Sequence, residues 1–164
     1  MGECVTLSVS SFLFAVRRPG ISLWPTDVSS LRGKDRLILS YSILVVDDSA
    51  LIRRSLKLSL EQNPDWKVCG EAVDGLEAIE LVPFLKPDIV VLDLAMPGMN
   101  GFEVARELHR TVPLLPVLMF TNHATPRLES EARAAGCSGV VSKSDHQQIL
   151  FDNIQRLLTP EINA

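Results

Sequence analysis

The chain has 164 residues, a formal net charge of −4 at pH 7, 46% hydrophobic residues and 5% aromatic residues. This length is enough for one domain with an aliphatic core. The acidic balance argues against direct nucleic-acid binding, which favours basic domains. Cys4, Cys69 and Cys137 are far apart and lack metal-ligand spacing, which indicates reduced thiols and a cytoplasmic protein.

Residues 1–40 are predicted to be an N-terminal extension, disordered or derived from a mis-assigned translation start. The apolar stretch at 5–16 has its flanking charges in the reverse order of a secretory signal, and it is too short and too polar to cross a membrane. Residues 17–36 mix Pro, Gly, Ser and charge without apolar periodicity. We therefore predict that residues 41–160 form the folded domain.

From Tyr41 onward the sequence predicts alternating strands and helices. Residues 42–46 form a short apolar run before two aspartates, which is typical of a buried strand. Residues 49–63 then predict an amphipathic helix that Pro64 ends. The expected buried stripe of this helix consists of Leu51, Ile52, Leu56 and Leu60.

The next four predicted elements run strand, helix, strand, helix, at residues 67–72, 74–85, 88–94 and 102–110. The spacing from Asp74 to Glu77 and from Asn100 to Glu103 predicts a capping box at the start of each helix. Pro83 is expected to perturb the first of these two helices. The strand at 88–94 is the most apolar of the chain, yet it contains Asp93.

The last four predicted elements repeat the order strand, helix, strand, helix, at residues 116–121, 127–136, 139–143 and 146–158. Pro126 is at the favoured first position of its helix, and Gly136 ends that helix. Ser144 and Gln147 are predicted to supply a capping box for the final helix.

Strict alternation of apolar strands with helices predicts an α/β fold, a doubly wound parallel sheet of five strands. In such sheets ligands bind beyond the carboxyl ends of the strands. With a strand order of 2-1-3-4-5, five polar groups converge on that edge. They are Asp47, Asp48, Asp93, Thr121 and Lys143.

The residue types at this edge predict phosphoryl chemistry. Three carboxylates close together repel one another, and Mg²⁺, which prefers carboxylate oxygens, relieves the repulsion. Beside the metal, Asp93 can attack phosphorus as a nucleophile. Lys143 and Thr121 are placed to stabilise the oxygens of the transferring group. A buried charge costs several kcal/mol unless it is paired, and this role explains why Asp93 interrupts an apolar run.

Residues 43 to about 158 resemble the receiver domains of bacterial two-component response regulators. The resemblance rests on the motifs ILVVDDSALIRRSL, IVVLDLAMPGMNGFEV, VLMFT and GVVSK. It implies the flavodoxin-like receiver fold in a single-domain protein, with Asp93 as the phosphoacceptor. It also implies a Mg²⁺ site formed by Asp47, Asp48, Asp93 and the backbone carbonyl of Ala95.

The resemblance further implies that Thr121 is the switch hydroxyl and that Lys143 contacts the phosphoryl group. The implied partners are a sensor histidine kinase or histidine phosphotransfer protein and a downstream protein target, without direct contact to nucleic acid or membrane. The chain is then no enzyme in its own right, beyond assisting its own Mg²⁺-dependent phosphotransfer and slow dephosphorylation.

Three residues depart from the family pattern. Val140 replaces the aromatic switch residue, Ser144 stands where many relatives have a cis-proline, and Asn122 follows Thr121 where Ala or Gly is commoner. Because Val140 is small and β-branched, we expect the response to phosphorylation to be confined mostly to residues 121–125 and the start of the following helix.

Three alternative functions remain. A haloacid dehalogenase-type enzyme needs a second Asp two residues after the nucleophile, where this chain has Ala95. A DNA-binding regulator needs a further domain after the last predicted helix, where only a short tail follows. A receiver-fold scaffold without phosphorylation is the third, and Val140 keeps it open. His123, near Thr121, is expected to be solvated rather than to influence hydrolysis.

Overall fold

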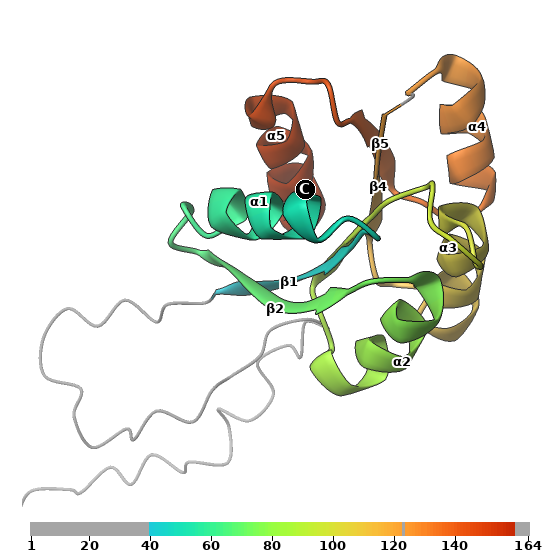
Figure 1. Ribbon diagram of the computed structural model, residues 1–164, viewed down its shortest axis with the longest axis horizontal. Coiled ribbons are helices and arrows are strands. Elements are labelled where there is room, and N and C mark those ends of the chain that lie inside the picture. The colour runs from blue at the N-terminus through green and yellow to red at the C-terminus, as the bar shows by residue number, and fades with distance from the viewer. Residues whose placement is uncertain (1–39, 123, 160–164) are drawn as a thin grey trace, which may run out of the picture.

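The computed structural model describes residues 40–122 and 124–159, in which strands and helices alternate as predicted (Figure 1). The strands are β1 (Tyr41–Val46), β2 (Trp66–Ala72), β3 (Ile89–Leu92), β4 (Val117–Thr121) and β5 (Gly139–Ser142). The helices are α1 (Ala50–Leu60), α2 (Gly75–Leu85), α3 (Gly101–Thr111), α4 (Pro126–Ala134) and α5 (Gln147–Leu158). Apart from Ser40, the predicted extension lies outside the described residues.

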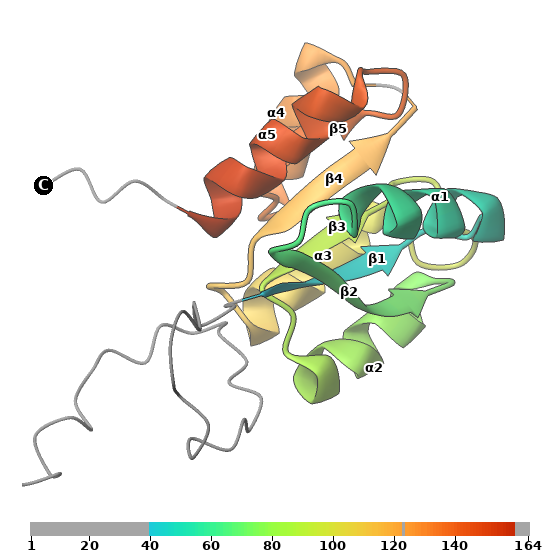
Figure 2. The same ribbon diagram turned by 90° about the vertical axis from the view of Figure 1, so that its left-hand side faces the viewer.

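The strands form one parallel sheet in the order β2-β1-β3-β4-β5, which confirms the predicted fold (Figure 2). The pairing of β1 with β2 shifts by one residue between Ile43 and Leu44. Ile43 lies opposite Val68 and Leu44 opposite Gly70, so Cys69 is the extra residue of a β-bulge on this edge strand. The carboxyl ends of all strands face the same edge of the sheet.

Helices cover both faces of the sheet. One core, beneath α2, α3 and α4, contains Leu44, Val46, Val90 and Leu92 from the central strands. The other core, beneath α1 and α5, contains the alternate residues of the same strands, Ile43, Val45, Ile89 and Val91. Figure 1 shows α1 and α5 together on one side of the sheet. Strands buried on both faces explain why their sequences are apolar runs without alternation.

Most helix starts follow the predicted capping chemistry. At α2, the side chain of Asp74 accepts a hydrogen bond from the Glu77 amide at 2.9 Å. The Glu77 carboxylate accepts from the Val73 amide at 2.7 Å instead of the Asp74 amide, so only half of the predicted capping box forms. Asn100 and Glu103 form a complete capping box at α3. At α4, the Thr125 side chain accepts from the Leu128 amide at 3.2 Å, with Pro126 as the first helical residue. These contacts satisfy amide groups that have no partner within the helix.

The predicted capping box at the last helix is wrong. The residue before α5 is His146, which makes no side-chain capping hydrogen bond. The Ser144 hydroxyl instead lies 2.7 Å from the Ser142 hydroxyl, and the Asp145 carboxylate accepts from the Ser142 amide at 3.1 Å. These hydrogen bonds form a turn directly after β5, so the helix begins later than the spacing of Ser144 and Gln147 suggests.

The predicted stripe of α1 is wrong at Leu51, which is 78% exposed, whereas Leu56 and Leu60 are buried and Ile52 is half-buried. Leu56 is five positions after Leu51, which places the two side chains about 140° apart around a helix. Another difference lies at β3. This strand ends at Leu92, so Asp93 follows the strand instead of interrupting it.

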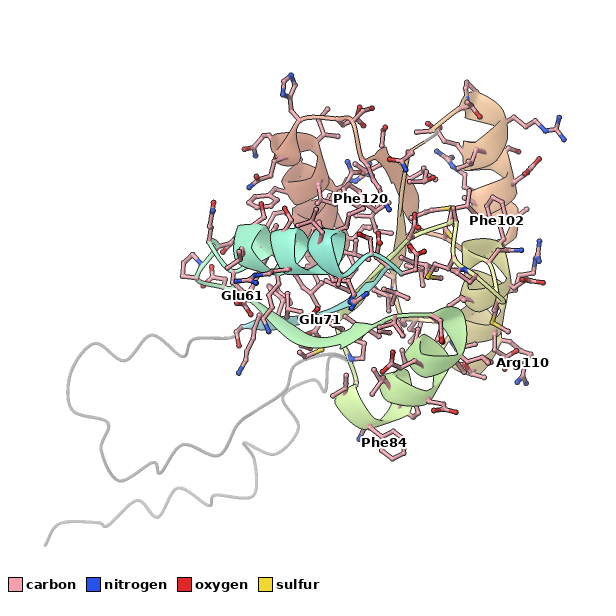
Figure 3. All side chains as sticks on the ribbon, viewed as in Figure 1. Glu61, Glu71, Phe84, Phe102, Arg110 and Phe120 are labelled. Atoms are coloured by element: carbon pink, nitrogen blue, oxygen red, sulfur yellow. The ribbon has the colours of Figure 1, made fainter. Side chains whose placement is uncertain are left out.

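At the amino edge of the sheet, a pocket of about 410 Å³ lies between the end of α2 and the loop before β4. Its lining is mostly apolar and includes Val82, Pro87 and Leu115, together with Asp88. Near it, Phe84 projects away from the end of α2 and is 83% exposed (Figure 3). This pocket is at the opposite edge from the predicted phosphoryl site and therefore has no part in that chemistry.

Within the described ranges, none of the helices is both long enough and apolar enough to cross a membrane.

Candidate functional site

All five predicted groups lie at the carboxyl edge of the sheet. Asp47 and Asp48 follow β1, Asp93 follows β3, Thr121 is the last residue of β4, and Lys143 follows β5. Two backbone hydrogen bonds extend the sheet into this region. The Asp93 amide donates to the Val46 carbonyl at 2.8 Å, and the Lys143 amide donates to the Thr121 carbonyl at 2.7 Å. The parallel pairing therefore brings together residues that are far apart in sequence.

Asp47, Asp48 and Asp93 form a cluster in which one carboxylate oxygen of each lies within 4.8 Å of the others. Asp47 and Asp93 are 1% and 4% exposed, whereas Asp48 is exposed. The Lys143 ammonium lies 2.6 Å from Asp47 Oδ2 and 3.0 Å from Asp93 Oδ1. Three carboxylates and one ammonium leave an excess of two negative charges at the site.

The pKa of Lys143 reflects two opposing effects. Burial lowers it, but the hydrogen bonds to Asp47 and Asp93, together with their charges, outweigh burial and hold the pKa above its usual range. The ammonium also lies 5.9 Å from the centre of the Phe120 ring. Lys143 is therefore a charged group at neutral pH, fixed between two carboxylates.

The cluster is a donor set that suits a hard divalent cation. Its oxygens are all carboxylate oxygens, the ligand type that Mg²⁺ prefers, and its excess negative charge favours a cation. The exposure of Asp48 leaves one side open to water, which Mg²⁺ retains in its coordination shell. Ala95 is exposed in the loop after Asp93. The role of its backbone carbonyl as a Mg²⁺ ligand stays a prediction.

The start of α3 packs directly against the backbone of Asp93. The Gly101 amide donates to the Leu94 carbonyl at 3.0 Å. A Cβ atom at Gly101 would lie 2.4 Å from the Asp93 carbonyl oxygen and 2.8 Å from the Leu94 Cα. Both are backbone atoms that cannot move aside, so only glycine fits here.

The residues that depart from the family pattern lie on or directly after β4 and β5. Val140 is half-buried and packs against the core beneath α2, α3 and α4. Thr121 is only 3% exposed. Asn122 is exposed, and His123 lies outside the described residues. The expected roles of Thr121 and Val140 in signal output stay predictions.

Sequence reasoning missed two groups that contact the acidic pair. The Ser49 amide donates to Asp47 Oδ1 at 2.9 Å. Arg53 donates through Nη1 to the backbone carbonyls of Asp47, at 2.7 Å, and Asp48, at 3.2 Å. The amphipathic pattern assigned Arg53 to the polar face of its helix. The only signal in the sequence was its place in the first turn after the aspartates.

Comparison with known proteins shows the family of this chain. Residues 43–155 match the family described as the response regulator receiver domain. A protein-glutamate methylesterase/protein-glutamine glutaminase of Pyrococcus horikoshii is 48% identical over 79 residues, 48% of this chain and 21% of that protein. The chain thus spans about a fifth of the length of that relative.

Solved structures show the same similarity. A two-component response regulator of the LuxR family from Aurantimonas sp. SI85-9A1 has a TM-score of 0.71 and 34% identity, covering 73% of this chain and 85% of that one. The response regulator domain of CheB from Thermotoga maritima has a TM-score of 0.66 and 31% identity, covering 73% and 98%.

Proposed function

Because the chain belongs to the response regulator receiver domain family, we propose that it is a phosphoacceptor of a two-component phosphorelay, phosphorylated on Asp93. The observation that carries this proposal is the lysine bridge. Lys143 contacts both Asp47 and Asp93, at 2.6 and 3.0 Å, beside a third carboxylate. A buried cation held between a nucleophilic carboxylate and an acidic pair suits phosphoryl transfer better than a structural role.

In the proposed reaction, a carboxylate oxygen of Asp93 attacks the phosphorus of a phosphohistidine on a sensor kinase or phosphotransfer protein. The new O–P bond forms as the P–N bond breaks, and the imidazole leaves with the bonding electrons. Asp47, Asp48, Asp93 and the Ala95 carbonyl would hold Mg²⁺, which would supply positive charge to the phosphoryl oxygens when it is bound. Lys143 would neutralise part of the charge on these oxygens.

Thr121 is proposed to respond to the product. A phosphoryl group on Asp93 adds strong hydrogen-bond acceptors at one fixed place. We propose that the hydroxyl of Thr121, the last residue of the strand next to β3, donates a hydrogen bond to one of them. Because Val140 replaces an aromatic switch residue, we expect the resulting change to stay mostly within residues 121–125 and the start of α4.

The output is proposed to pass through contact with a downstream protein, in the cytoplasm, without direct binding to nucleic acid or membrane. Beyond assisting its own phosphorylation and slow dephosphorylation, the chain is not proposed to have enzymatic activity. The similarity to methylesterases covers 79 residues and 21% of the Pyrococcus protein, so that activity is not carried over to this chain.

The test is labelling by a small phosphodonor. The full chain, incubated with acetyl phosphate and Mg²⁺, should gain one phosphoryl group by intact mass. Asp93→Asn should abolish the labelling, and Asp48→Ala should reduce it by weakening Mg²⁺ binding. Asp88→Asn is the matched control because it makes the same change at the other end of β3, and it should label normally. Stoichiometric labelling of the Asp93→Asn variant would overturn the proposal.

A further inference from the structure

Arg53 links the acidic pair to the edge strand of the sheet. Its side chain is 12% exposed, and its Nη1 donates to the carbonyls of Asp47 and Asp48 at 2.7 and 3.2 Å. At the other side of the guanidinium, Nε lies 3.5 Å from Glu71 Oε2, which is close enough for an ion pair, although Nε has no hydrogen-bond partner among the described residues. Glu71 is on β2, close to α1 (Figure 3), and Lys57 lies 3.7 Å from its other oxygen. The guanidinium of Arg53 therefore pairs with Glu71 on one side and contacts the backbone of Asp47 and Asp48 on the other.

The two carbonyls that Arg53 contacts lie on either side of the Asp48 Cα. Each carbonyl belongs to a planar peptide unit, and a residue has only two soft dihedral angles between such units. Fixing both planes therefore fixes the direction in which the Asp48 side chain leaves the backbone. Asp47, by contrast, is also fixed through its carboxylate, by the Ser49 amide and Lys143.

The Asp48 carboxylate has no such restraint of its own. It is exposed, and within residues 40–122 and 124–159 it makes no hydrogen bond or ion pair. Its distance from the other two carboxylates, within 4.8 Å, thus depends on the backbone that Arg53 holds. A guanidinium suits this task because it is always charged and presents several donors in a rigid plane.

We propose that Arg53 is a positioning residue for the divalent-cation site: it sets the place of Asp48 through two backbone carbonyls, and Glu71 anchors it. This inference rests on the proposed function, because it assumes that the acidic cluster binds Mg²⁺. Glu71 has a second effect, since its negative charge offsets the charge of Arg53 and limits repulsion of the incoming cation.

The direction in which Mg²⁺ affinity changes when Arg53 is replaced distinguishes a positioning role from simple charge repulsion. A positive side chain near a cation site repels the cation, so removing its charge should strengthen Mg²⁺ binding slightly. Loss of positioning should weaken it instead. Arg54 is the matched control because it is the next residue on α1, carries the same charge and is exposed.

The experiment is calorimetric titration of Mg²⁺ into the full chain and its variants, each shown to be folded by circular dichroism. Arg53→Met should weaken Mg²⁺ binding about tenfold, as losses of outer ligand-orienting groups commonly do. Arg54→Met should leave it unchanged or strengthen it slightly. Glu71→Gln should weaken it by a smaller factor. Without Mg²⁺, the amide resonances of Asp48 and Ser49 should shift in Arg53→Met and stay in place in Arg54→Met.

The outcomes distinguish the inference from the proposed function. If the natural chain binds no Mg²⁺, both are overturned. If it binds Mg²⁺ and Arg53→Met binds as tightly as Arg54→Met, only the role of Arg53 is overturned. Should Arg53→Met fail to fold, Arg53→Lys replaces it, with Arg54→Lys as control. A lysine keeps the charge but loses the planar donor set, so equal affinities of these two variants would overturn the inference.

Discussion

Two aspartates flank the same four-residue strand, and the groups that contact them differ. Asp88, just before β3, accepts hydrogen bonds at one carboxylate oxygen from the Ser42 amide, at 2.6 Å, and the Ser42 hydroxyl, at 2.8 Å. Its own amide donates to the Ser42 carbonyl at 2.7 Å. Asp93, just after β3, faces two other carboxylates and a lysine. Asp88 connects strands, whereas Asp93 lies beside two carboxylates that repel it and one ammonium that attracts it.

The difference shows how a structural carboxylate can be told from one that is proposed to be functional. Asp88 satisfies a backbone donor that would otherwise be buried without a partner, so its presence favours the fold. Asp93 adds a third negative charge to a site that Lys143 neutralises only in part, which opposes the fold when no cation is bound. Exposure does not separate the two residues, since both are buried, at 9% and 4% exposed.

The largest effect that would sharpen this comparison is on phosphorylation, through Lys143. Lys143→Met removes the one cationic partner that Asp93 has within residues 40–122 and 124–159, and we expect phosphorylation by acetyl phosphate to slow by about 100-fold, as losses of a single charge-stabilising donor typically do. Initial rates from intact-mass spectra would measure this. Lys86→Met, beside Asp88 in the pocket at the amino edge, is the control and should be phosphorylated at the natural rate. Equal rates in the two variants would remove Lys143 from the reaction.

The second effect is on stability and should have opposite signs at the two ends of β3. Asp88→Ala leaves the Ser42 amide without its acceptor, so we expect the free energy of unfolding to fall by about 1–3 kcal/mol. Asp93→Ala removes a repelling charge, while Lys143 keeps its ion pair with Asp47. We therefore expect this variant to have a free energy of unfolding that is higher by up to about 1 kcal/mol. Urea denaturation without Mg²⁺ would measure both. A comparable loss in both variants would show that the two aspartates are alike.

A smaller effect concerns the titration of Asp88. Burial raises its pKa above 3.8, although the hydrogen bonds from Ser42 act in the other direction. The folded state therefore holds this proton more tightly than the unfolded state. The protonated Asp88 carboxyl group therefore stabilises the folded state. This stabilisation is fully present below pH 3.8 and is lost as the pH rises through the folded-state pKa of Asp88. Ser42→Ala removes one hydrogen bond to the carboxylate, so it should raise the pKa further. Carboxyl carbon NMR titration would test both directions, and a pKa below 3.8 would contradict the first.

The smallest expected effect is that of removing residues 1–40. The five β–α units are complete without them. The free energy of unfolding of a variant that begins at Tyr41 should therefore differ from that of the full chain by no more than about 0.5 kcal/mol, and the variant should bind Mg²⁺ equally well. Because Ser42 lies near the start of this variant, it also tests whether the contact with Asp88 needs the preceding segment. A large fall in melting temperature would show that the extension packs on the domain and that the predicted boundary is wrong.

The alternation of strands and helices was predicted correctly from local signals, such as apolar runs and capping residues. The strand order was also correct, but it came from the resemblance to receiver domains, because local signals do not say which strands pair. The sequence also predicted that Asp47, Asp93 and Lys143 meet, since the ends of neighbouring parallel strands share an edge. The place of Arg53 was not predictable in this way. Helical periodicity gives the face on which a side chain starts, but Arg53 reaches back to the preceding loop and is half-buried there.

The same limit explains the errors at Leu51 and Ser144. An apolar residue in the first turn of a helix matches the pattern even where no other element covers it, and Leu51 is 78% exposed. A serine three residues before a glutamine matches a capping box, but the Ser144 hydroxyl bonds to Ser142 instead. Both outcomes depend on tertiary surroundings that a spacing rule does not contain.

The bulge at Cys69 also bears on how copies of this protein can associate. An open sheet has two edge strands with free backbone groups, and these can pair with the edge of another chain. In β2 the bulge interrupts the regular ladder, and the exposed Lys67 adds a charge next to it. At the other edge, β5 has only four residues. Neither edge offers a long regular template, so this architecture disfavours extension of the sheet from one copy to the next and leaves the helical faces as the surfaces for self-association.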